Sequence, residues 1–153
     1  MKFSTRQDTD IPADALFRAV GNFPSLERML VRRGATVRRL DDMVRPGVGI
    51  GWEIGFDWRG RRRGLDLRVA RYEPNELIAL DGTSDQFELQ IRMTVVALTP
   101  SRSRLIFEAD VQPRGMKARL LLQTAKLGKA QLDRKFAQRI ADFVTQISAE
   151  AAA

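Results

Sequence analysis

Two arginines in a predicted β-hairpin, Arg61 and Arg63, are the side chains best placed to bind a charged group. Segments 52–58 and 64–69 both alternate apolar and polar residues, which is typical of two strands with one buried face. Matching the two apolar faces puts Arg63 opposite Phe56, on the apolar side of the hairpin. An arginine at the rim of an apolar cavity can hold a carboxylate or a phosphate through two parallel hydrogen bonds.

The same register leaves a second interpretation of these arginines open. It also puts Arg61 opposite Trp58, near the turn. If the tip of the hairpin projects beyond the core, Arg61 and Arg63 stack on Trp58 and Phe56 in solvent and bind nothing. The other facing pairs in this register are Asp57 with Arg62, Ile54 with Leu65, and Trp52 with Leu67.

The sequence contains neither cysteine nor histidine, which removes several kinds of site. Without cysteine there are no disulfides, no thiolate nucleophiles and no sulfur ligands for metals. Without histidine the commonest general base and the commonest metal ligand are missing. Zinc sites of the cysteine and histidine type and Ser-His-Asp triads are therefore excluded, and we expect no metal and no cofactor.

Two other groups of residues resemble known functional motifs but lack features that those motifs require. Glu53 and Asp57 share the polar face of one strand, about 13 Å apart at a rise of roughly 3.3 Å per residue. That separation is too large for the paired carboxylates of a glycosidase, so we expect ion pairs with Arg62 and Arg68. Segment 47–51 has three glycines but lacks the Lys-Ser/Thr of a phosphate-binding loop, which favours a bend at a strand start.

Composition is typical of a single globular domain, with 44% hydrophobic and 29% charged residues among 153. The formal net charge of +7 indicates either a solvated basic surface or an attraction to anionic partners. No apolar run approaches the roughly 20 residues that span a bilayer, and the N-terminus turns polar at once. We therefore expect a cytoplasmic protein; the sequence does not indicate an oligomeric state.

The hydrophobic period changes along the chain and so divides it into elements. A weak strand at 3–7 is followed by helical spacing, with Asp10 as the expected N-cap and short helices over 13–20 and 25–31. Between residues 35 and 111 the period is two and the turns are short. This part of the chain predicts an antiparallel meander with one apolar face.

After Pro113 the apolar residues recur every three or four positions as far as Ile147, from Leu120 onward. They predict one amphipathic helix of roughly 30 residues, bent near Gly128, with residues 148–153 as a frayed tail. Its basic face is either solvated or in weak contact with an anionic membrane, and without a platform of aromatic residues we do not expect nucleic acid. The basic residues are Arg114, Lys117, Arg119, Lys126, Lys129, Arg134, Lys135 and Arg139.

This order of elements resembles the helix-grip fold of the START-related lipid-transfer and birch-pollen-allergen superfamily, also labelled SRPBCC or polyketide cyclase/dehydrase-like. Segments 11–17 (Ile-Pro-Ala-Asp-Ala-Leu-Phe) and 49–53 (Gly-Ile-Gly-Trp-Glu) and the helix at 118–147 carry the resemblance. It implies an α+β domain over residues 1–153, with a curved seven-stranded antiparallel sheet around the C-terminal helix. Members of the superfamily bind lipids, sterols, polyketides or other apolar molecules between sheet and helix; some are enzymes and many only bind or carry.

The leading hypothesis is therefore a non-catalytic binder or carrier of a small hydrophobic or amphipathic molecule. One alternative is a cyclase- or hydratase-like enzyme that uses Arg63, Tyr72 or a cavity carboxylate, and another is a basic adaptor at membranes or nucleic acid. A fully packed core in place of a pocket is also open. The predicted ligand-binding residues are Trp52, Ile54, Phe56, Arg63, Leu65, Leu67, Phe87, Leu89, Ile91, Leu105, Phe107, Leu121 and Leu132.

Overall fold

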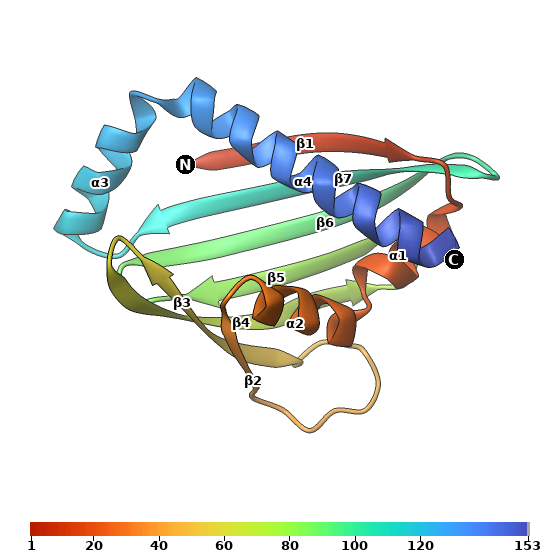
Figure 1. Ribbon diagram of the computed structural model, residues 1–153, viewed down its shortest axis with the longest axis horizontal. Helices are drawn as coiled ribbons and strands as arrows, with labels where there is room; N and C mark the ends of the chain where they lie inside the picture. The colour runs from red at the N-terminus through yellow and green to blue at the C-terminus, as the bar shows by residue number, and fades with distance from the viewer. Residues whose placement is uncertain (153) are drawn as a thin grey trace.

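A curved antiparallel sheet wraps around a long C-terminal helix in the computed structural model, which describes residues 1–152 (Figure 1). The spatial order of the strands is β1-β7-β6-β5-β4-β3-β2, and every neighbouring pair is antiparallel. The predicted seven-stranded sheet and the α+β fold class are thus confirmed. The strands are β1 (Lys2–Thr9), β2 (Thr36–Arg39), β3 (Gly51–Trp58), β4 (Arg61–Glu73), β5 (Leu77–Thr83), β6 (Phe87–Thr99) and β7 (Arg102–Pro113).

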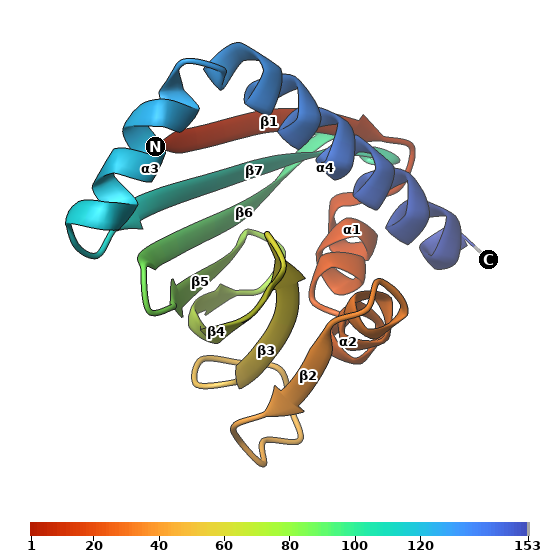
Figure 2. The ribbon, with the colours of Figure 1, turned by 60° about the vertical axis from the view of Figure 1, so that its left-hand side comes forward.

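The described residues form four helices, which lie on the concave side of the sheet or at its end (Figure 2). Helix α4 crosses the concave face over β1 and packs against α1, which also contacts β6 and β7. Helix α2 lies beside β2, and α3 packs against β7 at one end of the sheet. No helix within residues 1–152 has the length and the apolar composition to cross a membrane. The helices are α1 (Ala13–Val20), α2 (Phe23–Arg32), α3 (Met116–Lys126) and α4 (Lys129–Ala152).

The prediction of one C-terminal helix with a bend is wrong, because the chain stops and restarts the helix at Leu127-Gly128. The amides of Leu127 and Gly128 donate to carbonyls three residues earlier, which tightens the end of α3. Gly128 costs about 1 kcal/mol relative to alanine inside a helix, so a break there is inexpensive. Its carbonyl then accepts the first hydrogen bonds of α4. Residues 148–152, predicted as a frayed tail, are part of α4, and Ala153 lies outside the described residues.

The two N-terminal helices begin at other residues than predicted. Helix α1 covers Ala13–Val20 as expected, but its N-cap is Pro12 and not Asp10, whose carboxylate instead accepts a hydrogen bond of 2.8 Å from Arg102 Nε. Helix α2 begins at Phe23, two residues early, because the Asn22 side chain accepts from the amide of Ser25. An asparagine at the N-cap satisfies one of the free amides of the first turn.

The register of the β3–β4 hairpin is confirmed pair by pair, including Phe56 opposite Arg63. Arg59 and Gly60 form the turn with φ of 51° and 72°, the two left-handed residues of a type I′ turn, which matches the twist of the strands. On the outer face Asp57 pairs with Arg62 at 3.3 Å, as expected. Glu53 pairs instead with Arg38 of β2 at 2.9 Å, because β2 adds to the edge of this hairpin.

Candidate ligand site

Burial of the concave face falls along the strands from one end to the other. At the end covered by α1 and α4, Leu16, Ile78 and Leu105 have no exposed surface. We call this the closed end. At the opposite end, beside α3 and the tip of the β3–β4 hairpin, apolar side chains on the same face are only half-buried. We call this the open end, and its residues are Phe56, Leu65, Phe87, Leu89 and Val111.

Hydrogen bonds that link segments far apart in the chain complete the closed end. The hydroxyl of Ser103, which has no exposed surface, donates to the carbonyl of Ile11 at 2.7 Å. The hydroxyls of Thr9 and Ser148 share a hydrogen bond of 2.6 Å, which ties the end of β1 to α4. Buried polar groups are costly unless paired, and these are paired within the chain. The closed end is therefore a core in which these buried polar groups are hydrogen-bonded.

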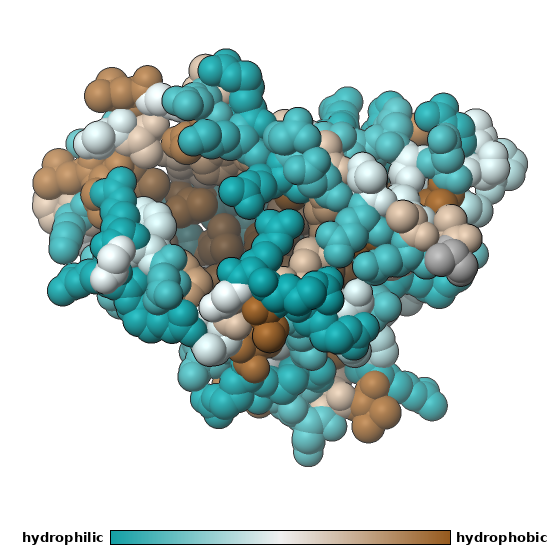
Figure 3. Space-filling model, viewed as in Figure 1, coloured by the Kyte–Doolittle hydropathy of each residue, from teal (hydrophilic) through white to brown (hydrophobic). Residues whose placement is uncertain are grey.

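A hollow with apolar side chains on its floor opens at the open end (Figure 3). Gly82 of β5 has no side chain and so leaves space over part of this floor. A Cβ at that position would lie 3.2 Å from Cδ1 of both Leu65 and Leu67, tighter than most side-chain contacts. The absence of a side chain at residue 82 thus leaves room for the neighbouring leucines.

The register brings Arg61 and Arg63 onto this face, and of the two only Arg63 is half-buried. Its guanidinium lies 5.3 Å from the centre of the Trp58 ring, and Arg59 covers the same ring at 4.8 Å. The Nε of Arg63 is buried and has no hydrogen-bond partner within the described residues. The side chain borders a recess of about 40 Å³ together with Phe56, Phe87 and the acidic residue Asp85. A buried donor without an acceptor costs about 1–3 kcal/mol, a cost that an acceptor at this position would remove.

A separate apolar cavity of about 80 Å³ lies between α2 and the sheet. Sites for drug-sized ligands enclose roughly 300–1,000 Å³, so this cavity is too small to take a lipid chain. Phe23 and Trp52 line it and pack edge to face, with ring centres 5.1 Å apart. Its lining consists of Phe23, Leu26, Glu27, Leu30, Trp52, Ile54, Leu67, Leu80 and Met93.

A chain of polar contacts connects this cavity to the β2–β3 loop. Glu27 Oε1 accepts from Trp52 Nε1 at 2.7 Å and lies 3.5 Å from Nη1 of Arg39. Arg39 donates to both carboxylate oxygens of Asp41, through Nε at 3.0 Å and Nη2 at 2.6 Å. Asp41 also accepts from the backbone amide of Gly51 at 2.8 Å. The network therefore fixes α2, β2 and the start of β3 relative to one another.

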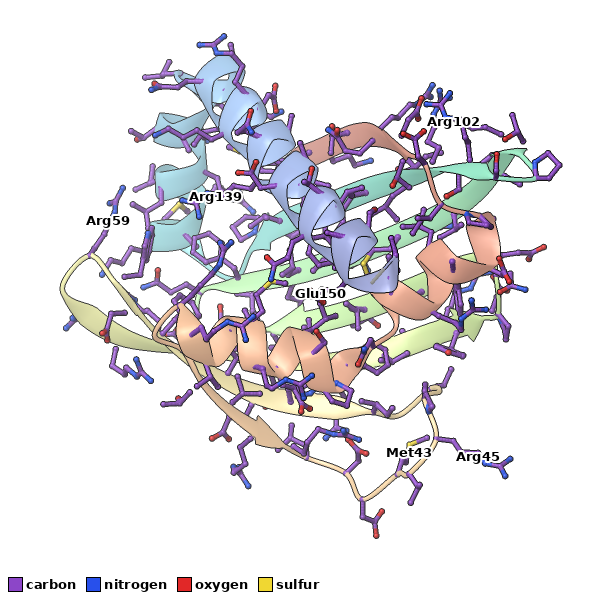
Figure 4. The ribbon with its side chains drawn as sticks, turned by 45° about the vertical axis from the view of Figure 1, so that its right-hand side comes forward. Met43, Arg45, Arg59, Arg102, Arg139 and Glu150 are labelled. Carbon is purple, nitrogen blue, oxygen red and sulfur yellow. The ribbon has the colours of Figure 1, made fainter. Side chains whose placement is uncertain are left out.

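The pKa of Asp41 is held well below its usual range. The largest cause is the hydrogen bond from Arg39, followed by the amide of Gly51; partial desolvation acts in the opposite direction, and the amide of Met43 lowers the pKa further. Asp41 is thus a permanent anion at neutral pH. Figure 4 shows Met43 and Arg45 on the loop that this carboxylate organises, away from α4.

The structure distributes the predicted ligand residues over three environments. Trp52, Ile54 and Leu67 line the small cavity under α2, and Leu105 belongs to the closed end. The half-buried residues at or near the open end are Phe56, Arg63, Leu65, Phe87, Leu89, Ile91, Phe107, Leu121 and Leu132.

Sequence reasoning missed Glu27, Arg39 and Asp41. One indication was available, because Glu27 interrupts an apolar face of α2 at helical spacing from Phe23 and Leu30. A carboxylate in such a position needs a partner, here the indole of Trp52 and the guanidinium of Arg39. The partners themselves come from other strands, and no local pattern identifies them.

The candidate acid and base groups for catalysis lie apart from Arg63. Tyr72 packs edge-on against Phe17, with ring centres 5.4 Å apart, next to the closed end. Nine residues of β4 separate it from Arg63, about 30 Å at 3.3 Å per residue. Tyr72 and Arg63 therefore cannot act on the same small group. Within residues 1–152, no group of three or more acidic side chains is arranged to hold a metal ion.

Comparison with solved structures identifies this architecture, whereas no family model and no curated protein sequence matches the chain. The Zhui aromatase/cyclase from Streptomyces sp. R1128 aligns with a TM-score of 0.70 at 16% identity, over 99% of this chain and 93% of the other. Ara h 8.0201 gives a TM-score of 0.61 at 10% identity, over 95% and 98% of the two chains. A START superfamily protein from Mycobacterium smegmatis gives 0.56 at 17% identity, over 90% and 97%.

These likenesses show that the chain has the helix-grip fold. The neighbours include an aromatase/cyclase and a START superfamily protein, as the resemblance in segments 11–17, 49–53 and 118–147 predicts. At identities of 10–17% the comparison concerns the fold. What this chain binds must therefore be argued from its own side chains.

Proposed function

We propose that this protein binds a small amphipathic molecule at the open end of the concave face. The apolar part of the ligand packs on the half-buried side chains there, and an anionic group such as a carboxylate meets Arg63. The observation that carries the proposal is the buried Nε of Arg63, which has no partner within the described residues.

The surroundings of Arg63 support an anionic head group. Its guanidinium is held over the ring of Trp58, which orients the fork of donors. Phe56 and Phe87 border the same recess, so a bound carboxylate would be partly shielded from water. Charge-assisted hydrogen bonds in such a setting are about twice as strong as neutral ones.

Binding or carriage agrees better with the site than catalysis does. Tyr72 lies about 30 Å along β4 from Arg63. The cavity carboxylate Glu27 is already engaged by Trp52 and Arg39. Neither group is positioned to exchange a proton with a ligand held at Arg63.

The test is a titration of a fluorescent fatty acid against two matched variants. Arg63→Met keeps the apolar stem and removes the charge, and it should weaken binding by about 1.5–3 kcal/mol, roughly 10- to 150-fold. Arg62→Met is the control, because it removes one charge from the adjacent residue on the outer face, where Arg62 pairs with Asp57. Its affinity should match that of the wild type. Unchanged binding in Arg63→Met, or equal losses in both variants, would contradict the proposal.

A further inference from the structure

Helix α3 is apolar on two opposite faces, and residues 1–152 cover only one of them. Towards the sheet, Ala118 is buried and Leu121 is half-buried. On the outer side Met116, Leu120 and Leu127 are 68%, 56% and 90% exposed. At 100° per residue these three positions fall within about 40° of one another, and Leu127 keeps helical backbone angles. They form one outward stripe, which we call the α3 stripe.

Basic residues border the α3 stripe on both sides. Lys117 lies on one flank, and Arg119 and Lys126 lie on the other, each about 80–100° from the centre of the stripe. Segment 111–132 contains no acidic residue. An outward apolar stripe between basic flanks is the pattern of a helix that lies in the interface of an anionic bilayer.

We infer that α3 docks this protein on an anionic lipid surface, with the α3 stripe in the headgroup region and its basic flanks on lipid phosphates. Exposed apolar side chains that line up on one face mark interaction sites more often than isolated ones do. Charge complementarity favours an anionic surface as the partner, because the flanks carry only positive charge.

Other occupants fit this surface less well. A nucleic acid could bind the basic residues through its phosphates. Its phosphate backbone, however, has no apolar surface to cover Leu127. A second copy of the chain would bring the like-charged flanks of two α3 helices together. Another exposed apolar group, Val44 and Val48 in the β2–β3 loop, adjoins the acidic pair Asp41-Asp42, which an anionic surface repels.

The place of α3 gives docking a consequence for the ligand site. The hollow of the open end lies beside α3, and Figure 4 shows Arg59 on the hairpin tip at that same end of the molecule. A docked α3 would bring the hollow close to the lipid headgroups. This consequence for ligand exchange rests on the proposed function, whereas docking itself does not.

Vesicle sedimentation tests the inference directly. The whole protein should sediment with vesicles of phosphatidylcholine and phosphatidylglycerol, and not with phosphatidylcholine alone. Replacing Lys117, Arg119 and Lys126 by Gln should lower partitioning on the order of 100-fold, at about fivefold for each cation near the surface. The control replaces Arg28 and Arg32 of α2 and its C-cap residue Arg33 by Gln, which makes the same change in net charge, and it should retain most of the binding.

A second pair of variants tests the apolar contribution. Met116→Gln, Leu120→Gln and Leu127→Gln together should reduce partitioning by 10-fold or more, on the order expected for about 25 cal/mol per Å² of lost apolar contact. Val44→Gln with Val48→Gln removes exposed apolar surface elsewhere and should leave partitioning unchanged. Circular dichroism checks that each variant is folded.

Several outcomes would overturn the inference. They are no sedimentation with either vesicle, equal losses in test and control variants, retention on duplex DNA in place of vesicles, or a dimer that the α3 variants dissociate. Arg63→Met should sediment like the wild type, and the α3 variants should bind fluorescent fatty acid normally in solution. Failure of docking is thereby distinguished from failure of the ligand site.

Discussion

The closed and the open end of the concave face are built from the same strands and the same alternation of residues, yet only one of them is a complete core. Strand β7 contributes Leu105 to the closed end and Val111 to the open end, six residues along one face. The difference comes from the helices. Helices α1 and α4 pack Leu16 and Ile140 against the closed end, whereas α3 lies to one side of the open end.

This comparison shows where stability and function are separated in the fold. At the closed end Ser103 has its hydrogen-bond partner, and at the open end Nε of Arg63 has none among residues 1–152. Unsatisfied groups and half-buried apolar surface lower stability, and they are what a ligand can complete. We therefore expect mutations at the closed end to affect folding and mutations at the open end to affect binding.

The largest expected effect is on stability at the closed end. Leu105→Ala should lower the free energy of unfolding by about 3–5 kcal/mol, because the residue has no exposed surface and its neighbours cannot collapse into the cavity. Leu89→Ala on the adjacent strand β6, half-buried at the open end, should cost about 1 kcal/mol. Urea denaturation measures both, and similar losses in the two variants would show that the ends are equally packed.

A smaller effect is expected from the two tryptophans: Trp52 lines the small cavity under α2, and Trp58 lies on the hairpin tip at the open end. Trp52→Phe removes the indole donor to Glu27 and should cost about 2 kcal/mol, since hydrogen bonds to charged groups contribute about 1.5–3 kcal/mol. Trp58→Phe, 39% exposed on the hairpin tip, should cost about 0.5 kcal/mol or less. In Trp52→Phe the remaining Trp58 emission should respond to fatty acid, because Trp58 contacts Arg63. An unresponsive Trp58 would place the ligand elsewhere.

Much of the sheet could be predicted from the sequence because strand alternation is a local pattern. The β3–β4 register follows from matching apolar faces, since a slip of one residue would mix them. The break in the C-terminal helix was harder to predict, because helical spacing is also only a local pattern. Leu120 and Leu127 continue the apolar spacing towards Ile147, and nothing in that spacing shows that they face outward once the chain breaks at Gly128.

The candidate site could be predicted only in part, because it depends on contacts between distant segments. Alternation puts Trp52, Leu105 and Leu89 on one face but does not say which of them a helix covers. The pairing of Glu27 with Trp52 and Arg39 joins residues from three elements, and their spacing along the chain is irregular. The position of Arg63 was predictable because it follows from the apolar faces of two neighbouring strands.

The smallest expected effect concerns the β2–β3 loop, where a carboxylate and not packing holds the chain. Because the folded state lowers the pKa of Asp41, its contribution to stability is complete above the unfolded value of about 3.9 and is lost as the pH falls below it. Asp41→Asn lacks this contribution at every pH. The wild type should therefore be more stable than the variant by a constant amount from neutral pH down to about pH 5, and the difference should shrink in more acidic solution.

The pKa values of Asp8 and Asp14 are also lowered, by Arg104 and Arg18, but both residues are present in both proteins and their effects on stability cancel. Urea denaturation over a pH series measures the difference. If it stays the same down to strong acid, Asp41 acts through the shape of its side chain alone, and the loop is not held by its charge.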